Sequence, residues 1–112
     1  MFTAYARERL LQALADMVVE AGWGTSGVAN ASGLTNPVYT TLLSKRLQAG
    51  ELVLEYALAW EGAGTRTLRE IGLFGRDANG NRVMLYRRVR DPITLEPGIT
   101  VIDRLTVRLE DL

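Results

Sequence analysis

The sequence predicts an α+β fold that is mainly β: an N-terminal amphipathic helix followed by a mostly antiparallel β-sheet, or a small β-sandwich, of four to five strands. Apolar side chains recur at helical spacing over residues 3–21, and from residue 51 onward apolar and polar side chains alternate. An Asn-Gly pair between two alternating runs is typical of a β-hairpin. The chain has 112 residues and no linker-like stretch, so we expect a single domain over residues 1–112.

The helix is predicted over residues 3–21. Thr3 is suited to cap its N-terminus, and Gly22 is suited to end it. The charged residues of this stretch are too many for a secretory signal or a membrane span, so we expect a soluble protein made in the cytoplasm. The expected apolar face consists of Leu10, Leu14, Met17 and Val18.

Residues 22–43 are expected to form a glycine-rich loop followed by a short helix. Glycine and small polar residues dominate the stretch up to Gly33, which favours a loop. Asn36 followed by Pro37 is a typical helix start, because proline fits the first helical position. The short helix is expected to end near Leu43.

Residues 44–109 are predicted to form the sheet. We expect a turn at residues 48–50 and a hairpin turn at Asp77–Asn81. Asp91-Pro92 and Pro97-Gly98 are expected to lie outside the sheet, because proline cannot donate a ladder hydrogen bond. The expected strands are Ser44–Leu47, Glu51–Trp60, Thr67–Phe74, Arg82–Arg90 and Ile99–Leu109.

The composition argues against several functions. Thirteen basic and thirteen acidic residues cancel, so there is no overall field that would attract nucleic acid or an anionic membrane. The chain has no cysteine, and therefore no disulfide, thiolate nucleophile or zinc–thiolate site. It also has no histidine, which is the usual general base and the commonest metal ligand. We expect no catalytic residues, no cofactor and no metal.

Two motifs resemble ligand-binding loops and have plainer interpretations. The run Gly22–Gly27 lacks the Gly-Lys-Ser/Thr ending of a phosphate-binding loop. Asp77, Asn79 and Asn81 resemble the start of a calcium loop, but Arg88 stands where that loop needs a bidentate glutamate. A structural loop and a hairpin turn are therefore favoured.

Two carboxylates, Glu70 and Asp103, lie in otherwise apolar predicted strands. A close pair could perform acid–base chemistry, but nothing in the sequence places the two near each other. Pairing of Asp103 with an arginine, or its exposure at a bulge, is the favoured interpretation, and Glu70 is expected to cap a turn or pair with an arginine.

The candidate contact residues are arginines and tryptophans. A nucleic-acid interface would need a net basic domain with interleaved aromatic residues, so the arginine-rich stretch 82–90 is interpreted as a solvated or subunit-facing strand. The tryptophans are suited to a core, a subunit interface or carbohydrate stacking. The candidate interface or binding residues are Trp23, Trp60, Arg82, Arg87, Arg88 and Arg90.

At residues 67–74 the chain resembles a group of small virion structural proteins of tailed bacteriophages, associated with tails, collars and fibres. The shared motif is a Thr-x-x-Glu-x-Gly-Leu-Phe strand, represented here by Glu70, Gly72 and Phe74. A glycine loop and short helix before this strand, and a hairpin and alternating strand after it, follow in the same order. The resemblance covers most of residues 22–109.

The resemblance implies a non-enzymatic virion protein of the tail, neck or collar, baseplate or fibre base. Such a protein would assemble into a trimer or a ring and contact other virion proteins, with no membrane or nucleic-acid partner. The alternative is a virion binding module, such as a receptor- or carbohydrate-binding tip or a capsid decoration protein. The chain departs from the group in a shorter hairpin before Glu51 and in Arg87 and Arg88, which replace small or apolar residues and prolines.

Overall fold

The computed structural model describes residues 1–109, and within this range the chain forms one helix and six strands. The predicted mainly β, α+β class is confirmed, although the strands number six rather than four or five. In chain order the elements are α1 (Ala4–Met17), β1 (Glu20–Gly24), β2 (Val38–Gln48), β3 (Glu51–Ala59), β4 (Arg66–Arg76), β5 (Arg82–Leu95) and β6 (Thr100–Val107).

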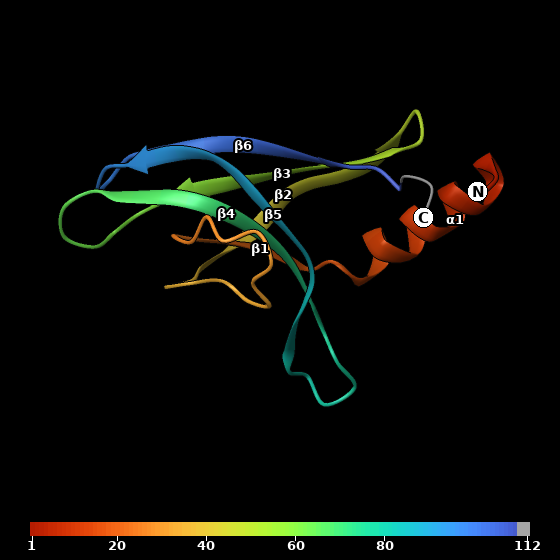
Figure 1. The fold of residues 1–112 in the computed structure, drawn as a ribbon, viewed down its shortest axis with the longest axis horizontal. Coiled ribbons are helices and arrows are strands. Elements are labelled where there is room, and N and C mark those ends of the chain that lie inside the picture. The colour runs from red at the N-terminus through yellow and green to blue at the C-terminus, as the bar shows by residue number, and fades with distance from the viewer. Residues whose placement is uncertain (110–112) are drawn as a thin grey trace.

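The six strands form one curled antiparallel sheet in the order β5-β4-β1-β2-β3-β6. The curl brings the edge strands β5 and β6 toward each other, and α1 lies at one end of the sheet (Figure 1). We call the junction between residues 86–90 of β5 and residues 103–106 of β6 the seam. The fold is an incomplete barrel, because side chains rather than backbone pairing close this junction.

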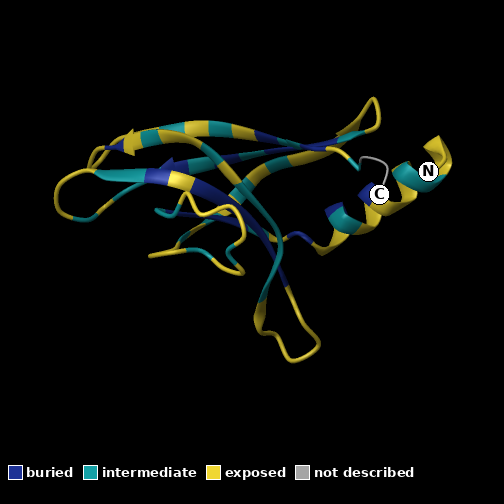
Figure 2. Ribbon diagram, in the orientation of Figure 1, coloured by how far each residue is buried: buried dark blue, intermediate teal, exposed yellow. Residues whose placement is uncertain are grey.

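The core lies inside the curl, between the strands and the C-terminal part of α1. The alternation predicted for β3 is confirmed, since Leu52, Leu54, Tyr56 and Leu58 are all at most 1% exposed. Figure 2 shows burial concentrated along the central strands, whereas most of α1 and the hairpin tips are exposed. Other fully buried side chains are Leu11, Trp23, Leu68, Ile71, Leu73 and Leu95.

The helix differs from its prediction in length and in orientation. Thr3 caps it as expected, and its Oγ1 accepts from the Ala6 amide at 3.1 Å. The helix ends at Met17 rather than at residue 21, because the chain turns directly into β1. The side chains buried at the sheet are Leu11, Ala15 and Val18, whereas Leu10 and Met17 of the predicted apolar face are about half exposed.

The loop expected from residue 22 begins later, because residues 20–24 form β1 at the centre of the sheet. Glycine normally weakens a strand, which is why the sequence favoured a loop here. In the structure Gly22 and Gly24 leave room for the side chains of Phe74 and Glu70 from the neighbouring strand β4.

The short helix predicted to end near Leu43 is wrong, since residues 38–48 form the single strand β2. Asn36 has a φ of 48° and redirects the chain instead of starting a helix. The run Val-Tyr-Thr-Thr that follows has high strand propensity and pairs with β1. Residues 38–41 of β2 pair with β1 and later residues pair with β3, where the register shifts between Leu42 and Ser44.

The exclusion of Asp91-Pro92 from the sheet is also wrong, because β5 continues to Leu95. Pro92 lies at an irregularity in the register with β4, between the pairs Glu70–Val89 and Leu68–Ile93. β5 is an edge strand, so an irregularity there accommodates a residue without an amide hydrogen. The closing strand runs over Thr100–Val107, shorter than predicted.

Candidate functional site

Glu70 is the centre of the first polar cluster, and its side chain is completely buried. Its Oε1 accepts from Arg87 Nε at 2.8 Å, and the Arg87 side chain is itself only 7% exposed. Its Oε2 accepts from the backbone amides of Ser26 at 3.0 Å and Thr35 at 2.8 Å. A buried carboxylate with three donors and an arginine counter-charge has the environment of a structural ion pair.

The two amides that Glu70 binds are the two ends of one loop, residues 25–35, which we call the strap. Thr25 and Thr35 also pair directly, through an amide-to-carbonyl hydrogen bond of 3.0 Å. Gly24 makes this arrangement possible, because a Cβ there would lie 2.3 Å from Glu70 Oε2. The strap is therefore anchored at both ends by one buried side chain of β4.

Gly72 and Phe74, the other members of the sequence motif, form an apolar patch beside the strap. Gly72 pairs with Gly22 of β1, and the Phe74 ring lies over both glycines. A Cβ at Gly72 would approach the ring to 2.8 Å, and the Tyr39 ring packs edge-on against Phe74 at 5.1 Å. The motif thus has a packing role.

The seam is the second polar cluster. The Tyr56 hydroxyl donates to Asp103 Oδ2 at 2.7 Å, and Arg90 forms an ion pair with the same carboxylate. Burial and the hydrogen bond to Asp103 raise the pKa of Tyr56 well above its ordinary value. Arg88 Nη2 donates to the Thr106 carbonyl at 2.9 Å, and Arg88 Nε donates to the Tyr86 hydroxyl at 2.9 Å.

The four candidate arginines therefore divide between different surroundings. Arg87 is buried against Glu70, whereas Arg88 and Arg90 close the seam. Arg82 pairs with Glu20 of β1, and its guanidinium lies 3.5 Å from the centre of the Tyr39 ring. The hydrogen bond that Arg82 donates to the Glu20 carboxylate raises the pKa of Arg82. The stretch 82–90 was predicted to face solvent or another subunit. This is wrong for Arg87, whose side chain is buried.

The tryptophans pack against each other, with ring centres 6.1 Å apart. Trp23 is completely buried, so it offers no surface to a partner in this conformation. Trp60 donates to the Gly64 carbonyl at 3.2 Å, and the Arg66 guanidinium lies 3.9 Å above its ring. A Cβ at Gly62 would meet the same ring at 2.0 Å. These neighbours leave little of the Trp60 ring for a stacked sugar.

Glu70 and Asp103 do not pair with each other, and each pairs with an arginine, as the favoured interpretation expected. Glu70 binds Arg87 and the strap, whereas Asp103 binds Tyr56 and Arg90. Glu110 and Asp111, whose negative charge is suited to arginines of another subunit, lie outside the described residues.

The Asp77 turn is also accounted for by local contacts. Asp77 Oδ1 accepts from the amides of Asn79 and Asn81, each at 2.9 Å. These hydrogen bonds, that from Asn81 first, lower the pKa of Asp77. The turn is the predicted hairpin, and its carboxylate caps the chain's own backbone.

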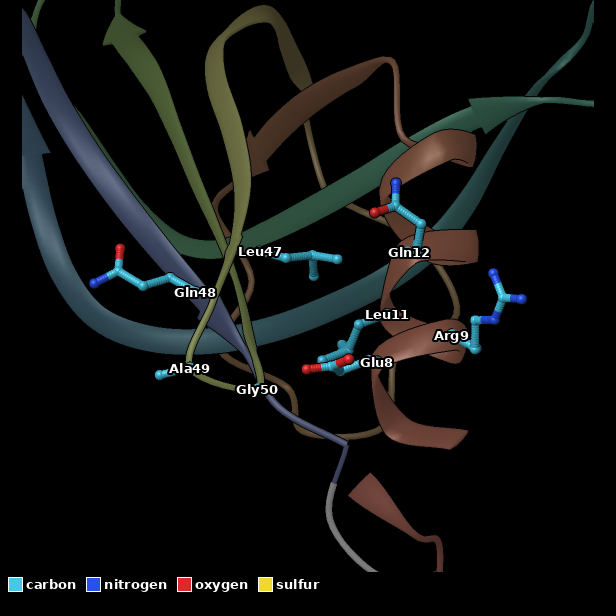
Figure 3. Close-up of a pocket in the computed structure, with 8 residues that line it drawn as sticks. All are labelled: Glu8, Arg9, Leu11, Gln12, Leu47, Gln48, Ala49 and Gly50. Carbon is cyan, nitrogen blue, oxygen red and sulfur yellow. The ribbon is translucent and has the colours of Figure 1, made fainter. Parts of the chain in front are cut away.

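A groove lies between α1 and the β2–β3 turn, with a volume of about 330 Å³. Figure 3 shows Leu11 of α1 and Leu47 of β2 at its base, with Glu8 and the turn residues Ala49 and Gly50 around it. Over residues 1–109 no three metal-ligating side chains gather in one place. In the same range no helix is long and apolar enough to cross a membrane.

The strap anchored by Glu70 and the seam were not foreseen from the sequence. The adjacent positions of Glu70 in β4 and Gly24 in β1 depend on strand pairing, which the sequence does not reveal when β1 is interpreted as a loop. No protein-family model matches this chain, and no curated protein matches it well enough to count as a relative.

Proposed function

We propose that this chain is a non-enzymatic structural subunit of a tailed bacteriophage particle, part of a tail, neck or collar, baseplate or fibre base. It acts by symmetric self-assembly and by contacts with other virion proteins. The placement in a virion rests on the order of sequence features around Glu70, Gly72 and Phe74. The assembly role is supported by features of the described surface.

The observation that carries the assembly role is the uncovered apolar side of α1. Leu10 is 43% exposed and Met17 51%, and the two lie on the same side of a 14-residue helix, two turns apart. A helix of this length is marginal in water unless packing supports it. Its buried residues, Leu11 and Ala15, lie in its C-terminal half, so packing within one chain supports that half alone. A second copy covering Leu10 and Met17 would supply the missing packing.

The polar clusters support a role without catalysis. The buried carboxylate of Glu70 and the partly buried one of Asp103 are both hydrogen-bonded and paired with arginines. Neither is directed into an enclosed cavity with a free partner, which an acid–base site would require. The stacking of Arg66 on Trp60 gives no specific support to a carbohydrate-binding tip.

The experiment compares two charge substitutions at exposed apolar positions. Leu10→Glu together with Met17→Glu should reduce the oligomer to monomers and leave the circular dichroism spectrum unchanged. Val28→Glu is the matched control, because Val28 is 63% exposed but lies on the strap. Retention of the oligomer by the α1 variant would contradict assembly through this helix. The virion role is tested by looking for the protein in purified particles of a phage whose genome encodes it. Its absence from those particles would contradict the virion role.

A further inference from the structure

We propose that the seam accepts an extended, carboxylate-bearing segment of another protein as an added β-strand. This inference is independent of self-assembly through α1. It assigns a binding role to the two edge strands of the sheet rather than to α1.

The first support is that both edge strands have unpaired backbone groups. Within residues 1–109, β5 pairs only with β4 and β6 pairs only with β3, so each presents an unpaired backbone edge along the seam. Arg88 donates to the Thr106 carbonyl across this gap. A guanidinium thus occupies the position of a strand amide, and unpaired edges are the surfaces to which extended peptides add.

The second support is the charge around the seam. Two hollows of about 440 and 170 Å³ lie along it, lined by four arginines and by Asp103. Arg90, Arg104 and Arg108 each pair with a carboxylate, so Arg88 carries the uncompensated charge. Among the described residues, Arg88 forms no ion pair, and its hydrogen-bond partners are the uncharged Tyr86 hydroxyl and Thr106 carbonyl. A half-buried arginine without a carboxylate gains most from an anionic partner, because such hydrogen bonds are the stronger ones. The four arginines are Arg88, Arg90, Arg104 and Arg108.

The same charges argue against a second copy at this position. A neighbouring copy would bring to the seam its own β5, which carries four arginines, or its own β6, which carries Arg104 and is followed by Arg108. Like charges opposite each other on paired strands are destabilising. An acidic strand from a different protein fits both the backbone edges and the charge.

The test uses an eight-residue peptide of alternating valine and glutamate, added to the full chain. Binding should protect the amides of β5 and β6 at the seam from hydrogen exchange. A valine–lysine peptide, and a valine–glutamate peptide with alternate amides methylated, should not bind. Absence of binding, equal binding of the lysine peptide, or protection located elsewhere would overturn the proposal.

Matched variants test the role of the seam charge. Arg88→Gln keeps a donor for Thr106 but removes the charge, and should weaken peptide binding about tenfold. Arg9→Gln removes an exposed arginine of α1 whose neighbour is Tyr5, and should leave the affinity unchanged. Unchanged affinity of Arg88→Gln would overturn the proposal. Dimerisation through protected seam amides without peptide would also overturn it, by making the seam a contact between copies.

Discussion

Arg87 Nε donates to Glu70 Oε1 at 2.8 Å, and both side chains are buried beneath the strap. This pair is the most enclosed ionic contact among residues 1–109. It joins β4 to β5, while the second oxygen of the same carboxylate holds both ends of the strap. One side chain therefore ties the strap to both β4 and β5.

Glu70→Ala should lower the free energy of unfolding by about 3–5 kcal/mol, because it leaves Arg87 buried without its counter-charge. The amides of Ser26 and Thr35 also lose their acceptor. Urea unfolding followed by tryptophan fluorescence measures the change. The control is Glu55→Ala, since Glu55 pairs with Arg46 at the exposed surface. Equal losses in the two variants would contradict the anchoring role.

Gly24→Ala should destabilise the protein by about 1–3 kcal/mol, the usual range for overpacking. The new Cβ would lie 2.3 Å from Glu70 Oε2 and 2.7 Å from the Thr35 carbonyl, so the strap must move. Gly33→Ala is the matched control, because a Cβ there meets nothing within 4 Å. Thermal unfolding should give a lower melting temperature for Gly24→Ala than for Gly33→Ala. Equal melting temperatures would show that the strap is loosely held.

Tyr56 should make the protein sensitive to alkali. Its pKa is raised in the folded state by burial and by the hydrogen bond to Asp103, so folding favours the protonated phenol. This stabilisation is complete below the unfolded-state value of about 10, and it is lost as the pH rises above that value. Phenolate absorbance should show a late step that accompanies unfolding. Tyr56→Phe should remove this step, and its persistence would exclude Tyr56 as the cause.

Lys45→Met should loosen the C-terminal end of α1. Lys45 Nζ donates to the Ala15 and Val18 carbonyls at 2.5 and 2.7 Å, which places a positive charge at the end of the helix where it is favourable. We expect a loss of about 1 kcal/mol in stability and faster hydrogen exchange of the last-turn amides. Arg46→Met, at the neighbouring position, should not change the exchange of α1.

The strand-forming pattern of the sequence was enough to predict β3, β4 and most of β5 and β6, and in β3 one face packs on the core as the alternation requires. The same reasoning failed at β1. Its two glycines are typical of a loop. In the structure they leave space for Glu70 and Phe74 of β4, and the strands β2 and β3 lie between β1 and β4 in the sequence. A glycine required by a neighbouring strand cannot be distinguished from a turn glycine by local pattern.

The orientation of α1 and the seam depend on tertiary packing in the same way. Leu10 and Leu11 are both apolar, and only the position of the helix at the end of the sheet determines that Leu11 is the buried one. The arginine-rich stretch of β5 was predicted as a strand, but alternation alone could not show that Arg87 lies beneath the strap while Arg88 crosses to β6. The partners of Arg87 and Arg88 are distant in the sequence, so a local pattern does not reveal them.

The molar mass of the purified chain in solution, measured by light scattering over a wide concentration range, tests the central claim most directly. The uncovered side of α1, with Leu10 and Met17 about half exposed, predicts a fixed multiple of the subunit mass, as expected of a trimer or a closed ring. A mass equal to one chain at every concentration would contradict the account of this protein as a self-assembling subunit.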